Sequence, residues 1–235
     1  MKLTEKIIPK HIGIILDGNR RYAEKMGINP LEGHEVGYEK VKKTMDWCKE
    51  LGVKELTVYT FSTENFARPK KEVSFLMKLF EKAFKELRDD KKKLKELRIR
   101  FIGRISMFSR TVQKIMNELM DITINNGPYT INFAMGYGGR SEIVDATKKI
   151  IQQVKDGKLD INDINEENFK KNLYLQSYPD LIIRTSESRL SGFLMYQSAY
   201  SEIIFLPDKL WPEFEKDDLI KCIEEFSRRN RRFGK

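Results

Sequence analysis

The sequence predicts an α/β fold, with a central, mostly parallel sheet that carries helices on both faces. Short, nearly unbroken apolar runs such as residues 12–16 are typical of strands buried on both faces. Longer segments such as residues 72–88 repeat apolar side chains three and four positions apart, which is typical of amphipathic helices. The two kinds of segment alternate along the chain, and this alternation predicts a parallel sheet. No linker, repeat or low-complexity tract interrupts them, so residues 1–235 are predicted to form a single domain.

The expected elements can be given in chain order. Strands are expected at residues 12–16, 53–61, 98–103, 129–135, 180–185 and 201–205. Helices are expected from residue 22 and at residues 35–51, 72–88, 111–124, 141–157, 168–173 and 216–232. Gly52 follows the helix at 35–51 as a stop signal. Lys91-Lys-Lys is interpreted as a solvated turn or helix extension, and the glycine turn at 136–140 as helix–strand packing rather than a phosphate loop.

Composition narrows the class of protein. The chain is 40% apolar and 34% charged, has no apolar run of roughly 20 residues that could span a membrane, and lacks a signal-peptide core, so we expect a cytosolic protein. Cys48 and Cys222 fall far apart in helical patterns, which favours two buried free thiols over a disulfide or a metal pair. The net charge of +9 implies an anionic partner, either nucleic acid, phosphorylated metabolites or a membrane surface.

The first predicted strand leads into a stretch whose residues are suited to a functional site. It ends in Asp17, Gly18 and Asn19, and Arg20 and Arg21 follow before the helix. A strand, a sharp polar turn and a helix gather backbone N–H groups and a positive helix end around one point, at the sheet edge where such folds bind ligands. A carboxylate there can hold a metal while the arginines hold its anion. The alternative interpretation is an Asp-Gly turn with solvated arginines.

The first, second and fifth strands all end in polar loops, which we expect to converge. The converging loops are expected to bring together Asp17, Asn19, Arg20, Arg21, His34, Ser62, Glu64, Asn65, Arg68, Arg184, Arg189, Ser191 and Glu202. The set contains no Ser-His-Asp order, no Walker-type lysine loop and no Cys/His metal spacing. Arginine forks match phosphate oxygens, and one carboxylate with phosphates is a usual Mg²⁺ environment. The set therefore predicts a site for two diphosphates, and these account for the arginines without a nucleic-acid partner.

Nine blocks in order resemble one family. They are Asp17-Gly-Asn-Arg-Arg-Tyr-Ala, Gly33-His, Phe61-Ser-Thr-Glu-Asn-Phe-Ala-Arg-Pro, Gly136-Tyr-Gly-Gly-Arg, Pro179-Asp-Leu-Ile-Ile-Arg-Thr, Arg189-Leu-Ser, Gln197-Ser-Ala-Tyr-Ser-Glu, Leu210-Trp-Pro-Glu-Phe and Arg231-Arg-Phe-Gly. Together they resemble the cis-prenyltransferases, the undecaprenyl and dehydrodolichyl diphosphate synthases. The likeness runs from about His11 to Gly234. Arg20, in place of the glycine of bacterial members, resembles the sequences of the archaeal and eukaryotic branch.

The resemblance implies an activity. The family condenses isopentenyl diphosphate repeatedly, in cis geometry and with Mg²⁺, onto an allylic diphosphate primer. For an archaeal-type member it implies geranylgeranyl diphosphate as primer, a long undecaprenyl-type diphosphate as product and precursor of a glycosyl carrier lipid, a homodimer, and peripheral membrane contact through the product. The apolar face of 72–88, by periodicity simply core, would line a hydrophobic product tunnel. A non-catalytic or short-chain member of the same fold is the alternative.

The same match implies residue roles. Asp17 would hold Mg²⁺, with Glu202 as a second contact, and Asn65 with Ser62 would remove or relay the proton, unless a diphosphate oxygen takes it. The matched substrate-binding residues are Gly18, Asn19, Arg20, Arg21, Tyr22, His34, Ser62, Thr63, Glu64, Phe66, Arg68, Arg184, Arg189, Leu190, Ser191, Arg232 and Gly234. Of these, Arg184, Arg189 and Ser191 would bind isopentenyl diphosphate, and Arg232 and Gly234 would reach into the other subunit's site.

The chain departs from the family pattern at three points. Pro30 stands where members commonly have an arginine, and the loop from Arg184 to Arg189 is one residue short and lacks its glycine. Tyr129 stands where bacterial long-chain enzymes have a smaller residue at the tunnel floor. On that basis alone, Tyr129→Ala is expected to lengthen the product.

The basic charge also generates a competing hypothesis, a nucleic-acid-binding module, which predicts steeply salt-dependent duplex binding. We expect instead that a gel-shift assay with duplex DNA at moderate salt gives no retarded band. A retarded band that weakens steeply as salt rises would contradict this expectation.

Overall fold

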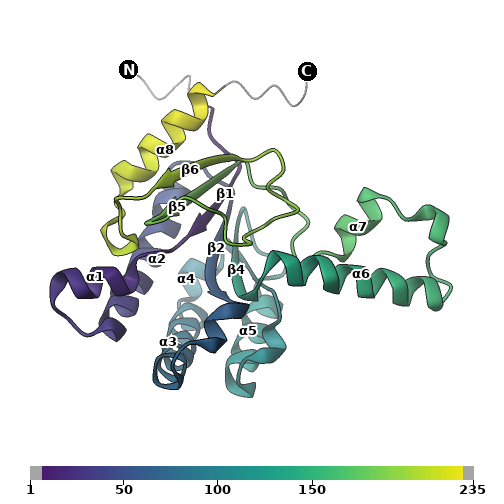
Figure 1. The fold of residues 1–235 in the computed structure, drawn as a ribbon, viewed down its shortest axis with the longest axis horizontal. Coiled ribbons are helices and arrows are strands. Elements are labelled where there is room, and N and C mark those ends of the chain that lie inside the picture. The colour runs from purple at the N-terminus through teal and green to yellow at the C-terminus, as the bar shows by residue number, and fades with distance from the viewer. Residues whose placement is uncertain (1–6, 230–235) are drawn as a thin grey trace.

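The computed structural model describes residues 7–229, which form a parallel sheet of six strands with helices around it (Figure 1). The order across the sheet is β3-β4-β2-β1-β5-β6, and every neighbouring pair is parallel. The strands are β1 (His11–Ile15), β2 (Glu55–Ser62), β3 (Leu97–Ile102), β4 (Tyr129–Tyr137), β5 (Leu181–Thr185) and β6 (Glu202–Leu206). The predicted α/β class is confirmed, and the sheet is parallel throughout.

The helices largely match the predicted segments. They are α1 (Asn19–Met26), α2 (Pro30–Glu50), α3 (Lys70–Asp89), α4 (Lys91–Leu94), α5 (Arg110–Thr123), α6 (Gly139–Lys155), α7 (Glu166–Asn172) and α8 (Lys216–Arg228), with short 3₁₀ turns that include η2 (Thr63–Ala67) and η5 (Trp211–Glu213). Helix α2 begins before residue 35 because Asn29 caps it, accepting a bond from Leu31 N at 2.9 Å, and Pro30 suits the first helical position. The helix predicted at 216–232 ends sooner, at Arg228, and Arg229 is extended.

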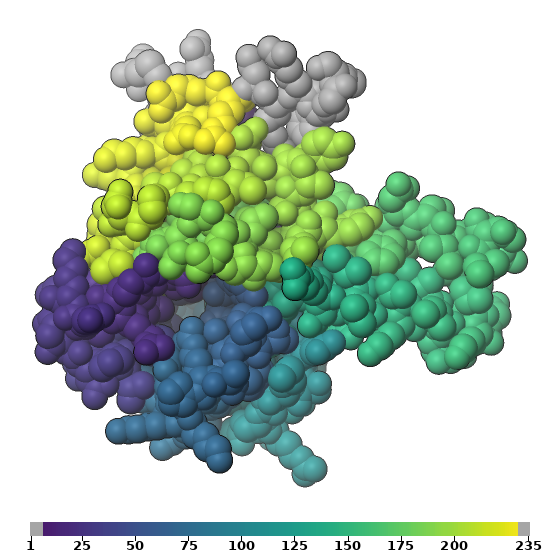
Figure 2. Space-filling model, in the orientation of Figure 1, coloured from purple at the N-terminus to yellow at the C-terminus, as the bar shows by residue number. Residues whose placement is uncertain are grey.

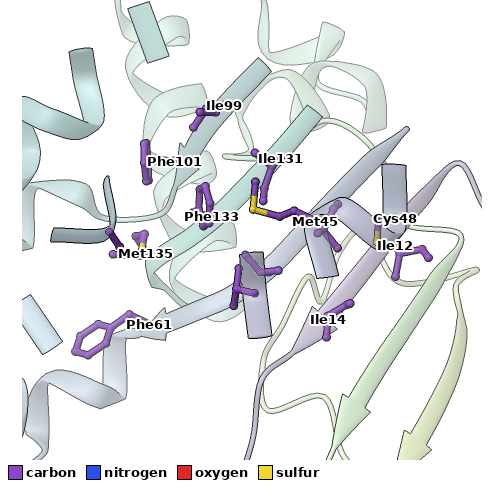
Figure 3. Close-up of a cluster of buried hydrophobic side chains, with 14 of the residues drawn as sticks. Ile12, Ile14, Met45, Cys48, Phe61, Ile99, Phe101, Ile131, Phe133 and Met135 are labelled. Carbon is purple, nitrogen blue, oxygen red and sulfur yellow. The ribbon is translucent and has the colours of Figure 1, made fainter. Parts of the chain in front are cut away.

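The two faces of the sheet are covered differently. Alternate side chains of β1, such as Ile12 and Ile14, point into a large core shared with α2, α3, α5 and α8. Figure 3 shows part of this core, with Met45 of α2 beside Ile131 and Cys48 of α2 beside Ile12. The opposite face carries Ile15, Ile182 and Phe193 in a smaller cluster, covered by the irregular segment 173–200 and the first turns of α6. Helices therefore dominate one face, and loops cover much of the other.

Aromatic rings pack the large core where β3 and β4 meet α3. Phe84 of α3 lies edge-on to Phe101 at 4.7 Å between ring centroids and tilted against Phe133 at 5.7 Å. Phe101 and Phe133 stack at 5.4 Å. Burying each such side chain contributes roughly 1.5–3 kcal/mol, so this wall is a rigid part of the fold.

Two glycines let α2 approach the turn that follows β1. A Cβ atom at Gly33 would lie 2.2 Å from the backbone oxygen of Asn19, and one at Gly37 would lie 2.2 Å from the side-chain oxygen of Asn19. Real Cβ atoms do not approach other atoms so closely, so only glycine fits at Gly33, where the atom belongs to the backbone, and a Cβ at Gly37 would displace the Asn19 side chain. The close approach fixes the polar turn at 17–19 against α2.

Gly33→Ala is therefore expected to lower the free energy of unfolding by about 1–3 kcal/mol through overpacking, although alanine favours helices more than glycine does. Urea denaturation would measure this loss. Glu39→Ala, at an exposed position of the same helix, is the control and should change stability by about 0.5 kcal/mol or less. Equal stability of the two variants would contradict the packing argument.

Candidate active site

A cavity of about 440 Å³ opens at the carboxyl edge of the sheet. At its mouth it is lined by Asp17, Gly18, Asn19, Arg20, Arg21, His34, Asn65 and Arg68. It continues between α2 and α3 to apolar side chains that include Leu76, Phe80, Phe84 and Phe133. Figure 2 shows the surface hollowed between the purple segment of α1 and the blue segment around α3. A charged rim thus leads directly into an apolar interior.

The turn after β1 is held by its own backbone. The carbonyl oxygen of Asp17 accepts hydrogen bonds from Thr185 Oγ1 at 2.7 Å, Ser186 Oγ at 3.1 Å and Trp211 N at 2.9 Å. Gly18 has a φ of 112°, and a Cβ there would lie 2.4 Å from Ser186 Oγ, so the position requires glycine. These contacts fix the direction in which the Asp17 carboxylate leaves the sheet.

The Asp17 carboxylate faces the guanidinium of Arg184, from the end of β5. Asp17 Oδ2 lies 2.6 Å from Arg184 Nη2 and 3.0 Å from Arg184 Nε. The Arg184 residue is only 3% exposed, and its Nη1 donates to Ser191 Oγ at 2.8 Å and to the carbonyl oxygen of Arg189. A buried arginine with partners on every nitrogen is fixed in position, so Asp17, Arg184 and Ser191 form one rigid unit.

Two more arginines meet beside this unit. Arg21 lies 3.2 Å from Glu187 through Nη2 and donates to the Ser186 carbonyl oxygen at 3.1 Å, while Arg189 Nη1 lies 2.7 Å from the other Glu187 oxygen. The Arg21 and Arg189 side chains are 48% and 65% exposed. Exposed pairs contribute about 1 kcal/mol or less, so both arginines can turn toward an incoming anion at little cost.

Across the mouth, basic side chains surround one carboxylate. Glu72 in the first turn of α3 lies within ion-pair distance of Arg68, His34 and Arg20. Burial lowers the pKa of His34, and the nearby Arg68 and Arg20 lower it as well, whereas hydrogen bonding to Glu72 and its negative charge act in the opposite direction. Arginine side chains therefore lie on both sides of the mouth.

Asn65 is tied into the turn after β2. Its Oδ1 accepts from Ser62 N at 3.0 Å, and Ser62 in return caps the backbone of residue 65. One of the two lone pairs of the amide oxygen is therefore engaged, and the amide nitrogen is a donor only. Burial leaves the neighbouring Tyr59 hydroxyl with a raised pKa, so it too stays protonated.

Asp17 is suited to Mg²⁺ only together with a ligand. Within residues 7–229 no group of three or more His, Cys, Asp or Glu side chains could hold a metal ion. Mg²⁺ is commonly held by one or two carboxylates plus waters and substrate phosphates. One accessible carboxylate, 38% exposed at a cationic rim, fits a site that the substrate completes.

Glu202 does not belong to this site within one chain. It pairs with Leu181 at the amino end of β5, at the edge of the sheet opposite to Asp17, and its carboxylate binds Arg229 at 2.9 Å. The expectation that Asp17 and Glu202 meet is therefore wrong for a single chain, because Glu202 begins its strand rather than ending it.

Other predicted substrate-binding residues lie around the cavity rather than on it. Phe66 packs edge-on against Phe61 and Phe108, and Leu190 packs in the smaller core. Thr63 lies close to Gly138, and Tyr22 is half-buried on α1. Burial raises the pKa of Glu64, but hydrogen bonds from its own backbone, Ser62 and Thr63, together with the charge of Arg140, lower it overall. The prediction for Arg232 and Gly234 lies outside the described residues.

Tyr129 does not line the cavity. Its ring lies at the amino end of β4 under Lys49 and Lys54, beside a separate pocket of about 20 Å³ with Cys48 and Leu56. Met45 is the side chain that borders both spaces. Tyr129 is therefore not part of the cavity lining, and Met45 separates the two spaces.

Sequence reasoning missed several cavity residues. Tyr59 and Thr60 of β2 line it, as do Tyr38 and Lys42 of α2 and Glu86 of α3. The polar ones form a seam between the helices: Glu86 Oε2 accepts from Tyr38 Oη at 2.8 Å and lies 3.7 Å from Lys42 Nζ. Lys93 Nζ lies 2.8 Å from Asp46. In the sequence, the only signal for these polar cavity residues is their helical spacing on the side of α2 and α3 that also carries apolar side chains.

Comparisons with known proteins agree with this arrangement. Residues 15–234 match the family described as "Putative undecaprenyl diphosphate synthase". The chain is 48% identical over its whole length to the tritrans,polycis-undecaprenyl-diphosphate synthase (geranylgeranyl-diphosphate specific) of Pyrococcus abyssi, covering 90% of that protein. It superposes on lavandulyl diphosphate synthase of Lavandula x intermedia with a TM-score of 0.90 at 34% identity, covering 97% of this chain and 99% of that one. It also superposes on a probable undecaprenyl diphosphate synthase of Campylobacter jejuni with a TM-score of 0.79 at 33% identity, covering 97% of this chain and 99% of that one.

Asp17→Asn keeps a hydrogen-bonding side chain next to Arg184 but removes the charge that a metal needs. We expect Mg²⁺-dependent turnover to fall about 100- to 1,000-fold, with an unchanged far-UV circular dichroism spectrum. Asp208→Asn, at an exposed position after β6, is the matched control and should keep full turnover. Activity of Asp17→Asn within threefold of the wild type would contradict the metal role.

Proposed function

The chain belongs to the undecaprenyl diphosphate synthase family of cis-prenyltransferases, and we propose that it extends geranylgeranyl diphosphate with isopentenyl diphosphate to a long undecaprenyl-type diphosphate. The observation that carries the proposal is the cationic rim at the mouth of a 440 Å³ apolar cavity. A diphosphate can bind the rim while its hydrocarbon occupies the interior. The curated relative from Pyrococcus abyssi is specific for geranylgeranyl diphosphate, which supports this primer.

The two diphosphates have separate cationic partners. Arg20, Arg68 and His34 line one side of the mouth and would bind the primer diphosphate, whose hydrocarbon would enter the cavity between α2 and α3. Arg184, with Arg189 and Ser191, would bind isopentenyl diphosphate on the other side. Bidentate guanidinium contacts would orient both groups, and orientation brings the reacting carbons together.

Asp17 lies between these two sides and would hold Mg²⁺ with diphosphate oxygens. When bound there, Mg²⁺ supplies a Lewis acid that neutralises charge as the primer diphosphate departs. Arg184 contacts the same carboxylate, so a diphosphate that binds Arg184 would release Asp17 from this pair. Gly18, Asn19 and Arg21 would complete the wrapping of the anion.

Proton loss completes the condensation, and the geometry around Asn65 bears on its acceptor. The Asn65 oxygen already accepts from Ser62 N, and an amide nitrogen does not accept a proton. Asn65 and Ser62 are therefore better suited to orient the reacting groups, while a diphosphate oxygen accepts the proton from the isopentenyl unit.

A short-chain product is the second candidate, since the chain superposes closely on lavandulyl diphosphate synthase. The length of the apolar cavity, which reaches from Asp17 to Phe84 and Phe133, favours the long-chain product. The non-catalytic alternative would give the Asp17–Arg184 pair a structural role alone.

We further propose a homodimer in which the C-terminal residues Arg232 and Gly234 of each subunit complete the site of the other. Strand β6 lies at the edge of the sheet, and the nearby Tyr200 is 68% exposed. An edge strand with an exposed aromatic side chain beside it is suited to contact with another chain.

Among residues 7–229, no helix combines the length and apolar character needed to cross a bilayer. We propose peripheral membrane contact through the hydrocarbon of the product.

Incubation with isopentenyl diphosphate, Mg²⁺ and geranyl, farnesyl or geranylgeranyl diphosphate tests the function. We expect geranylgeranyl diphosphate to be extended most efficiently, to long products whose new double bonds are cis when resolved by chromatography and NMR. Products of one condensation would support the short-chain reading, and no product with any primer would refute the enzyme.

Met45→Ala should join the cavity to the pocket beside Tyr129 and so lengthen the products. The expected loss of stability is about 2–5 kcal/mol, so the assay is run at a temperature where the variant remains folded. Tyr129→Ala is the control, because Tyr129 lies beyond Met45 and its removal should leave product length unchanged. Longer products from Tyr129→Ala and not from Met45→Ala would contradict the assignment.

A further inference from the structure

Glu72 is a buried carboxylate at the place where an anion is expected to bind. The residue is 9% exposed and lies in the first turn of α3. Its Oε1 lies 3.0 Å from Arg68 Nη1 and 3.3 Å from His34 Nε2, and its Oε2 lies 3.9 Å from Arg20 Nη1. One acid therefore joins basic side chains from α1, α2 and the segment before α3.

A carboxylate in this position is unfavourable for anion binding unless it does something else. By itself it repels a diphosphate at the same mouth. Its effect on the three bases is the opposite, because without it three cations would crowd together and repel one another. A shared acceptor holds long, flexible side chains in one arrangement, and flexible cations bind anions poorly because ordering them costs entropy.

Glu72 also acts on the charge of His34. The charged groups that face His34 are Glu72 from α3, Arg68 from the segment before α3 and Arg20 from α1. Burial and the two arginines lower the pKa of His34, and Glu72 is the group that raises it. An imidazolium that can donate to a phosphate oxygen therefore depends on this carboxylate.

We propose that Glu72 is a positioning residue for the primer diphosphate, which holds Arg68, His34 and Arg20 in the arrangement that binds it. The inference rests on the proposed function, because it takes the primer to be an allylic diphosphate. Glu72 does not touch the substrate in this scheme and acts only through the three basic side chains.

The same helix provides a matched control. Glu81 is a carboxylate of α3 that lies outside the lining of the cavity and pairs with Lys85 Nζ of the same helix at 2.6 Å. Glu81→Gln removes an equal charge from the same helix without touching the cavity or the three basic side chains of the mouth.

The test compares Glu72→Gln, Glu72→Asp and Glu81→Gln. Calorimetric binding of geranylgeranyl diphosphate alone and steady-state KM values for both substrates are measured after thermal melts confirm folding. Glu72→Gln is expected to weaken primer binding and raise the primer KM about tenfold, with the KM for isopentenyl diphosphate within twofold of the wild type. Glu72→Asp, which keeps the charge, should recover part of the loss, and Glu81→Gln should change neither value by more than twofold.

The pH profile separates positioning from a merely structural role. Loss of the His34 proton raises the primer KM, and removal of Glu72 lowers the His34 pKa further, so the rise should begin at a lower pH in Glu72→Gln. Primer affinity that is unchanged or tighter in Glu72→Gln, an equal loss in Glu81→Gln, or an unshifted profile would overturn the inference. If Glu72→Gln does not fold, Glu72→Asp decides, since primer affinity identical to the wild type despite the shorter reach would also overturn it. A wild-type protein that extends no primer would instead refute the proposed function.

Discussion

The ion pair between Asp17 and Arg184 is the interaction on which the site depends. Arg184 is buried, and a buried guanidinium without a carboxylate would be strongly destabilising. The pair joins the ends of β1 and β5, and the same arginine fixes Ser191 and the carbonyl of Arg189. Within the protein, the pair satisfies both charges. A metal and a diphosphate that arrive together would replace each partner's counter-charge, whereas the metal alone would leave the buried guanidinium of Arg184 unpaired.

The sheet separates two kinds of chemistry. Along one face, Ile12, Ile14 and the rings around Phe84 and Phe133 form an apolar interior that is continuous with the cavity. At the carboxyl edge, the turns after β1, β2 and β5 present charge and hydrogen-bond donors. Parallel strands produce this division directly, because all of their carboxyl ends lie at one edge. A substrate with a charged head group and a hydrocarbon tail therefore fits the charged edge and the apolar cavity together.

The sequence alone predicted the parallel sheet and the meeting of Asp17 with Arg184, because apolar runs that end in polar residues identify carboxyl ends. It failed at Glu202, because Glu202 begins its strand and so lies at the amino edge, and a motif match carries no information about which edge a residue occupies. It also did not show that Met45 lies between the cavity and Tyr129, because only the fold brings α2 against the start of β4. Glu72 was missed because an acid in the first turn of a helix is ordinary there. Its three basic neighbours come from segments that only the fold brings together.

The polar seam between α2 and the α3–α4 segment has a mechanical consequence. Its bridges, from Tyr38 and Lys42 to Glu86 and from Lys93 to Asp46, are water-accessible contacts, and separating each one costs about 1 kcal/mol or less. Pulling apart an interlocked hydrocarbon surface of similar length would cost several times more. The cavity can therefore widen by separation of α2 from the α3–α4 segment as the bound hydrocarbon lengthens, while the aromatic side chains around Phe84 and Phe133 keep their positions. Elongation would then move these helices apart without disturbing the packed core.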